Sequence, residues 1–397
     1  MFFLNPRVLI LAALTALAPF AIDTYLPAFH LMGEDLNTNS EYIQHSLTFY
    51  LVPYTLMTLF HGAISDSIGR IKTIKYGLIL FIIGSIGCAL STSIEILWFS
   101  RMLQGIGGGA GNVVARAMVR DLYSGATAQK VMATIQIIFG IAPAIAPVVG
   151  GLLLGFGWQS IFIFLVIYSI IISFFSIKFL PETINEDNKL KFSFSLILNR
   201  YKALIIDKNF IFLILAVSFN FAAFFLYVLA SPIFLMNHLD FTANEFGYLF
   251  IPTVTGMIIG SMLSKKTAGV VSPRRMLKIA YFWMLLMTSL NLIFCIFFTS
   301  VPWINIGFIA FYNIGMASVM PVISIKALDC FPKSRGTAAS GQAFSQMLIS
   351  SIVAGLVIPL VWNSLATLSM AMFFIFALGL FFITKTEAWK DKNILLG

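Results

Sequence analysis

The segment VLILAALTALAPFAIDTYLPAFH, residues 8–30, is long and apolar enough to cross a bilayer as a helix, yet it contains a carboxylate, Asp23. Pro19 and Pro27 lie four residues to either side of Asp23, so all three share one face of a helix. An ionisable side chain at membrane depth is costly, and each proline leaves a backbone carbonyl without its helical donor. We therefore expect this face to line a cavity rather than to contact lipid.

Apolar segments of similar length recur along the whole chain. The 397 residues are 59% hydrophobic and 10% charged, and the mean hydropathy is +0.94, which excludes an ordinary soluble domain. The first segment is too long for a cleaved signal peptide and lacks a small-residue cleavage site. The pattern predicts an all-α membrane protein with twelve transmembrane helices, at residues 8–30, 45–64, 74–94, 96–119, 127–156, 158–180, 209–236, 245–264, 276–299, 303–327, 337–360 and 363–385.

The basic residues indicate the orientation of these helices. With a cytoplasmic N-terminus, every Lys and Arg except Arg101 falls at or near a predicted inside connection, whereas the outer connections contain acidic residues and no basic ones. This segregation follows the positive-inside rule and predicts that both termini are cytoplasmic. The net charge of +9 is thus a topology signal and does not indicate nucleic-acid binding.

The two halves of the chain have the same plan. Each has six predicted helices, and a basic segment follows the second helix of each half, at 69–75 and 265–275. We predict an N-terminal six-helix bundle at 1–180, a cytoplasmic linker at 181–207 with an interfacial helix, and a C-terminal six-helix bundle at 208–397. Parallel six-helix repeats with a substrate site between them are a transporter architecture.

Arg101 breaks the charge pattern, because it lies near the outer end of the fourth predicted helix. Arg101, Gln104, Gly108 and Asn112 form one helical stripe. The same segment contains small residues that allow another helix to approach closely: Gly105, Gly107, Gly108, Gly109 and Gly111. Arg101 either extends to the outer headgroups or points into the bundle at a depth similar to that of Asp23.

Four segments carry a family resemblance. GAISDSIGRIKT, residues 62–73, resembles the loop motif of the major facilitator family, although Ser67 stands where a basic residue is usual. RMLQGIGGGAG at 101–111 resembles the fourth-helix motif of proton-coupled antiporters, and APAIAPVVGG at 142–151 resembles their fifth-helix motif, with alanine replacing two glycines. APFAIDTYLPA at 18–28 is similar to the first-helix signature of drug exporters. Together with RAMVRDLY at 116–123, these motifs resemble the Bcr/CflA subfamily of drug:proton antiporters, densely in the first half and only in architecture in the second.

The resemblance assigns roles to particular residues. It implies a conformational latch formed by Gly62, Asp66, Gly69, Arg70, Arg116 and Arg120. Asp66 is placed to accept hydrogen bonds from a helix N-terminus or to pair with Arg116 or Arg120, and the alternative is a solvated charged turn. The antiporter motif comprises Pro143, Pro147, Gly150 and Gly151, which form either a tight seal or an ordinary helix contact.

Other polar residues within the predicted helices are candidates for substrate binding. Asp23 and Arg101 are the candidate coupling residues; the candidate binding residues are Tyr25, Tyr50, Tyr54, Gln104, Asn112, Gln136, Asn220, Tyr227, Asn313, Gln342 and Gln346. Interhelical hydrogen bonds explain such side chains equally well. The three cysteines and four histidines show no metal-binding spacing, so no metal site is expected.

These observations favour a transporter over an enzyme, because no nucleophile–base pair and no nucleotide-binding loop is recognisable. The expected function is proton-coupled antiport that exports small, lipophilic or cationic compounds by alternating access, with Asp23 binding a proton or substrate in turn. The alternative is a major facilitator transporter of one specific metabolite or siderophore, in either direction. We expect no cofactor beyond the proton gradient, no nucleic-acid partner, and a monomer in the bilayer of the bacterial inner membrane.

Overall fold

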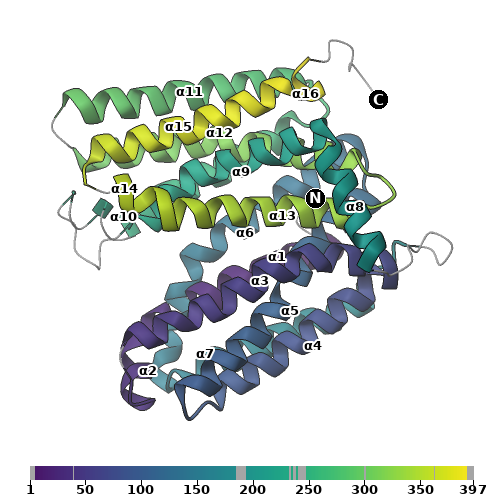
Figure 1. Ribbon diagram of the computed structural model, residues 1–397, viewed down its shortest axis with the longest axis vertical. Coiled ribbons are helices and arrows are strands. Elements are labelled where there is room, and N and C mark those ends of the chain that lie inside the picture. Colours follow the sequence, from purple (N-terminus) through teal and green to yellow (C-terminus); the bar gives the residue numbers. More distant parts are fainter. Residues whose placement is uncertain are drawn as a thin grey trace. The chain divides into compact units, whose positions relative to one another are not determined.

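The computed structural model describes residues 5–38, 40–184, 194–231, 234–235, 238–239, 247–298, 301–361 and 363–390 (Figure 1). These residues form helices and turns, with no strand among them. Twelve helices have 18 or more residues, in the order predicted from the sequence. They are α1 Pro6–Asp23, α3 Ser40–Ile68, α4 Arg70–Ala89, α5 Ile94–Leu122, α6 Gly125–Leu153, α7 Gln159–Phe179, α9 Lys208–Leu229, α10 Gly247–Thr267, α11 Pro273–Phe297, α12 Pro302–Asp329, α13 Arg335–Ile352 and α15 Leu365–Lys385.

Most of these helices are apolar enough to cross a membrane by themselves. Among the described residues, nine helices are long and apolar enough to cross a membrane. A tenth span is present if the bent pair Gly125–Pro143 and Ile145–Phe156 is counted as one helix crossing the membrane. The long helices that do not meet this criterion are α5 and α13, which contain many glycine, serine, glutamine and charged residues. Helix α5 carries the glycine-rich motif with Arg101, and α13 carries Gln342 and Gln346.

Shorter elements complete the described chain. They are the 3₁₀ helices η2 Leu26–Ala28 and η3 Leu154–Phe156, the short π-helix η7 Val353–Val357, and the α-helices α2 Phe29–Asp35, α8 Phe194–Ile206, α14 Ile358–Val361 and α16 Glu387–Lys390. The helix predicted within the 181–207 linker is present as α8. Residues 185–193 of that linker lie outside the described residues.

The prediction of one continuous helix over 8–30 is wrong. Helix α1 ends at Asp23, and η2 and α2 follow after Thr24 and Tyr25. Pro27 has no N–H to donate to the carbonyl of Asp23, so the helical hydrogen-bond ladder stops there. The carboxylate therefore lies at the end of a helix rather than within one.

The described chain divides into two compact units. The first unit contains Met1–Leu122, Ile141–Tyr201 and Pro332–Phe344, and the second contains Tyr123–Gly140, Lys202–Phe331 and Ser345–Gly397. In the first unit α5 packs against α1, α3 and α4, and α7 packs against α1 and α4 (Figure 1). In the second unit α12 packs against α9, α10 and α11, and α15 packs against α9 and α11. The domain boundaries at residues 181 and 207 stay a prediction.

Glycines of α5 allow its neighbours to approach at backbone distance. A Cβ added at Gly105 would overlap the carbonyl oxygen of Tyr50 in α3, and one added at Gly107 would overlap that of Gly77 in α4. A Cβ at Gly111 would lie 2.9 Å from the carbonyl oxygen of Leu14 in α1. The close approach expected from the glycine-rich segment is therefore present on three sides of α5.

Candidate functional site

Asp23 lies at the C-terminal end of α1 with a half-buried side chain. Within the described part of the chain, its carboxylate forms no hydrogen bond and no ion pair. The last carbonyls of a helix carry partial negative charge, and one of them, that of Ala21, accepts a hydrogen bond from Arg101. Among the described residues, the Asp23 carboxylate is therefore an acceptor with no donor bound to it.

Arg101 is fully buried within the first unit, at 0% exposure. Its Nη1 donates to the carbonyl oxygen of Ala21 at 3.1 Å and to Oε1 of Gln104. Its guanidinium lies 4.3 Å from the ring centre of Tyr25 and 4.6 Å from that of Tyr50, which places the cation against two aromatic faces. The side chain thus points into the unit and binds α1 two residues before Asp23.

A second layer of hydrogen bonds holds Gln104. Its Nε2 donates to Oγ of Ser85 in α4 at 2.8 Å, and Ser85 donates to the carbonyl oxygen of Phe81 at 2.8 Å. The hydroxyl of Tyr25 lies 3.2 Å from Oγ of Ser46 in α3. Sequence reasoning missed both serines, because a single serine in an apolar helix carries no distinguishing signal.

The remaining candidates of the first half lie along the seam between α3 and α5. Tyr50 and Tyr54 are buried, with ring centres 5.7 Å apart, and Asn112 Nδ2 donates to the hydroxyl of Tyr54 at 3.3 Å. Tyr25, Tyr50, Tyr54, Gln104 and Asn112 thus share one polar region with Arg101. The structure brings these predicted residues together inside the first unit.

The second unit contains a neutral polar network. Asn220 in α9 donates through Nδ2 to the hydroxyl of Tyr281 at 2.5 Å, and the hydroxyl of Tyr312 donates to the carbonyl oxygen of Asn220 at 2.9 Å. The hydroxyl of Tyr227 accepts from Asn291 Nδ2 at 3.1 Å. Nothing in the sequence singled out Tyr281, Tyr312 or Asn291, since only their contacts distinguish them from other residues of the membrane-spanning helices.

The other predicted residues are dispersed. Asn313 Nδ2 donates to the carbonyl oxygen of Thr253 at 3.3 Å, which is an interhelical contact of the kind expected between membrane helices. Gln136 lies in α6, and Gln342 and Gln346 lie in α13, where both have polar or electrostatic contacts.

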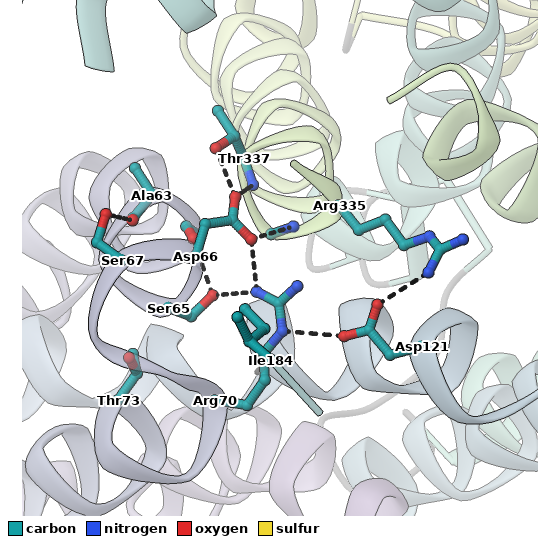
Figure 2. Close-up of polar contacts among 12 residues, drawn as sticks. Ala63, Ser65, Asp66, Ser67, Arg70, Thr73, Asp121, Ile184, Arg335 and Thr337 are labelled. Carbon is teal, nitrogen blue, oxygen red and sulfur yellow. Dashed lines mark hydrogen bonds and ion pairs between the residues drawn. The ribbon is translucent and has the colours of Figure 1, made fainter. Parts of the chain in front are cut away.

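Asp66 forms a second, buried cluster at the end of α3 (Figure 2). Its Oδ2 accepts hydrogen bonds from the backbone N–H of Thr337 at 2.9 Å and from the Thr337 hydroxyl at 2.8 Å. Its Oδ1 accepts from the backbone N–H of Gly336 at 3.1 Å and from Arg70 Nη1 at 2.7 Å. Of the partners considered for Asp66, the structure places a helix N-terminus at its carboxylate, namely the N-terminus of α13.

Two further charged residues, Asp121 and Arg335, extend the cluster beyond the ion pair of Asp66 and Arg70. Arg70 Nε lies 3.1 Å from Oδ2 of Asp121 in α5, and Arg335 Nη1 lies 3.1 Å from Oδ1 of the same carboxylate (Figure 2). Asp66 is 1% exposed and Arg70 is 2% exposed, so a solvated charged turn does not describe this site. Arg116 and Arg120 also have polar or electrostatic contacts. Asp121 and Arg335 were not predicted as members of the cluster.

Two glycines of the loop motif meet a steric requirement. A Cβ on Gly62 would overlap the carbonyl oxygen of Gly336, so α3 and α13 touch through their backbones. Gly69 has φ +106°, and a Cβ there would lie 2.5 Å from Oε2 of Glu182. The Glu182 carboxylate accepts from the N–H groups of Arg70 at 2.9 Å and Ile71 at 3.1 Å, and so caps α4. Glu182 was missed because its partner lies more than a hundred residues away.

No group of three or more potential metal ligands occurs among the described residues. Pro143, Pro147, Gly150 and Gly151 of the antiporter-like motif all lie in α6. The functional geometry therefore consists of a helix break beside Asp23, a buried arginine and a charged cluster formed by α3, α4, α5 and α13.

Such a fold and site define a membrane transporter, and the chain belongs to the Major Facilitator Superfamily, whose family model matches residues 11–355. It is 29% identical to a bicyclomycin resistance protein homolog of Haemophilus influenzae, over 92% of each chain. It is 30% identical to the uncharacterized MFS-type transporter YdgK of Bacillus subtilis, over 88% of this chain and 87% of the relative. It is also 30% identical to multidrug resistance protein MdtL of Escherichia coli, over 67% of each chain.

Solved structures agree on the fold. The proton:xylose symporter XylE has a TM-score of 0.74 at 14% identity, with 95% of this chain and 94% of that chain covered. A bacterial homologue of ferroportin in an outward-facing state has a TM-score of 0.75 at 12% identity, covering 96% and 98%. At these identities the likeness extends to the fold alone.

Proposed function

We propose that this protein is a proton-coupled antiporter of the bacterial inner membrane that exports small, lipophilic or cationic compounds by alternating access. The observation that carries the proposal is the half-buried Asp23 carboxylate at the end of α1, without a partner among the described residues. Relatives named for multidrug and bicyclomycin resistance support export of drug-like compounds. The proton gradient is the driving force, and a monomer with both termini in the cytoplasm completes the proposal.

In the proposed cycle, Asp23 exchanges a proton for substrate. On the acidic outer side the carboxylate takes up a proton, and on the inner side a cationic or polar substrate displaces that proton. Tyr25 and Tyr50 lie against the guanidinium of Arg101, which binds α1 two residues before Asp23, so in this cycle they would hold Arg101 in place beside the carboxylate. The Asp66 cluster would act as the latch, since it joins α3, α4, α5 and α13 through charge-assisted hydrogen bonds that must break if these helices separate.

A second candidate is transport of one specific metabolite or siderophore. One observation favours it: Nε and Nη2 of the buried Arg101 have no hydrogen-bond partner among the described residues. A guanidinium with two nitrogens that lack acceptors suits an anionic substrate group. A transport assay in vesicles with an imposed pH gradient, run against cationic, neutral and anionic compounds, separates the two candidates.

Proton coupling is tested by substrate-induced proton release from detergent-purified protein. We expect release from the wild type and none from Asp23→Asn, because asparagine keeps the size of the side chain but cannot titrate. Asp23→Glu should retain part of the activity with a shifted pH profile. Glu95 is an exposed carboxylate, so Glu95→Gln is the matched control and should behave as the wild type. Equal release from wild type and Asp23→Asn would show that Asp23 is not the coupling residue.

A further inference from the structure

The end of α1 beside Asp23 is an irregular stretch of backbone. The N–H of Thr24 still donates to the carbonyl of Phe20 at 3.2 Å, and its hydroxyl donates to the same carbonyl at 2.5 Å. The N–H of Ala28 donates to the carbonyl of Tyr25 at 2.9 Å, within the next turn. The break is thus confined to a few residues, and its position determines where the Asp23 carboxylate lies.

Helix α6 contacts this break through Gly150. A Cβ added at Gly150 would overlap the carbonyl oxygen of Thr24 and would lie 2.8 Å from its carbonyl carbon and 3.2 Å from its Cα. The obstacle is backbone, which cannot rotate away as a flexible side chain does. The adjacent Gly151 is exposed, and a Cβ there would have nothing within 4 Å. Of the glycine pair in the antiporter-like motif, only Gly150 is required by the packing.

Two neighbours therefore hold the end of α1, and they act by different means. Arg101 binds the carbonyl of Ala21 through a charged hydrogen bond, whereas Gly150 allows α6 to reach the carbonyl of Thr24. We infer that Gly150 is a positioning residue for Asp23: its missing side chain lets α6 support the backbone that breaks before Pro27, and thereby sets the carboxylate's distance from Arg101. This inference rests on the proposed function for its consequence in transport, but its geometric part is independent of it.

A charge on α6 does not contribute to the surroundings of Asp23. Residues 141–153 of α6 include no ionisable side chain, so a change at Gly150 alters the surroundings of Asp23 only by moving backbone. The titratable and charged groups around this end of α1 are Arg101 of α5, Tyr50 of α3, Cys88 of α4 near Arg101, Tyr168 of α7, whose ring packs on Phe20, and the adjacent Tyr25. All of them are retained when Gly150 is replaced.

The test compares Gly150→Ala with Gly151→Ala in purified full-length protein. The first readout is labelling of Asp23 by a carbodiimide, which reacts with the protonated carboxyl, followed by mass spectrometry across a pH series. We expect the labelling midpoint of Gly150→Ala to move by about half a pH unit or more, and that of Gly151→Ala to match the wild type. The second readout is transport driven by a pH gradient, which Gly150→Ala should reduce by ~10- to ~100-fold.

A third variant separates positioning from general packing damage. A Cβ at Gly256 in the second unit would overlap the carbonyl oxygen of Ala310, a similar steric conflict far from Asp23 in the sequence and in the other unit. Gly256→Ala should leave the labelling midpoint unchanged, whatever its effect on thermal stability. An unshifted midpoint in Gly150→Ala, or the same shift in Gly256→Ala, would overturn the inference.

If Gly150→Ala does not fold, Thr24→Val decides the question, because it removes the hydroxyl bond at the break without adding bulk. A shifted labelling midpoint then supports the inference, and an unshifted one overturns it. Failure of the proposed function is distinguishable: transport that survives Asp23→Asn removes the coupling role, whereas the labelling shift in Gly150→Ala concerns position alone.

Discussion

Arg101 donates a hydrogen bond from Nη1 to the carbonyl oxygen of Ala21, 3.1 Å away, and so holds the end of α1 two residues from Asp23. A cation at a helix C-terminus is stabilised by the partial negative charge of the last carbonyls. The rings of Tyr25 and Tyr50 provide further stabilisation. Arg101 thus balances its buried charge with backbone and aromatic groups, and within the described residues it has no carboxylate partner.

Replacement of Arg101 should abolish transport. Arg101→Ala removes the bonds to Ala21 and Gln104, and we expect at least a ~100-fold loss of gradient-driven uptake in vesicles. Arg101→Lys keeps the charge but not the planar fork, so it should retain only part of the activity. Lys75 is an exposed basic residue, and Lys75→Ala serves as the control. Full activity of Arg101→Ala would reduce this residue to a packing role.

Neutralising Asp66 should slow the exchange between conformations. Asp66→Asn keeps an acceptor for the N–H groups of α13 but loses the ion pair with Arg70, which then retains Asp121 as its carboxylate partner. We expect the protein to insert and fold, with a lower transport rate and altered crosslinking between cysteine pairs placed on the outer side. Thr337→Val removes one hydrogen bond at the same site and should give a smaller effect. Transport at the wild-type rate in Asp66→Asn would contradict the latch.

A side chain at Gly69 should destabilise the protein. Its φ of +106° with ψ of 157° disfavours residues with a Cβ, at a cost of about 1–3 kcal/mol, and the added Cβ would also press on Glu182. We expect Gly69→Ala to lower the unfolding temperature in detergent. Combining it with Glu182→Ala should relieve the steric part only, so the double variant should remain less stable than Glu182→Ala alone. Equal stability of these two variants would show that the backbone tolerates alanine.

The orientation in the membrane can be tested by reporter fusions. Because the basic residues segregate to alternate connections, fusions at Asn188 and after Asn393 should both report the cytoplasm. A fusion in the predicted outer connection near Asn37 should report the opposite side. A periplasmic signal at either of the first two positions would rule out the predicted topology.

The sequence by itself determined the class of protein and the order of its helices. The length of each apolar segment and the positions of Lys and Arg are local properties of the sequence, and the bilayer constrains both directly. Twelve helices could therefore be predicted in order. Asp23, Arg101 and Asp66 also stood out in the sequence, because ionisable groups in or beside apolar helices are rare and need a reason.

Only the tertiary structure decided what these residues contact. Arg101 meets a carbonyl 80 positions away, and Asp66 meets an N–H 270 positions away. The break in α1 after Asp23 and the need for glycine at 150 but not at 151 likewise appear only once α5 and α6 lie against α1. The physical reason is that hydropathy sets which segments become helices, whereas the rotation of each helix and its neighbours depend on close packing across the whole unit.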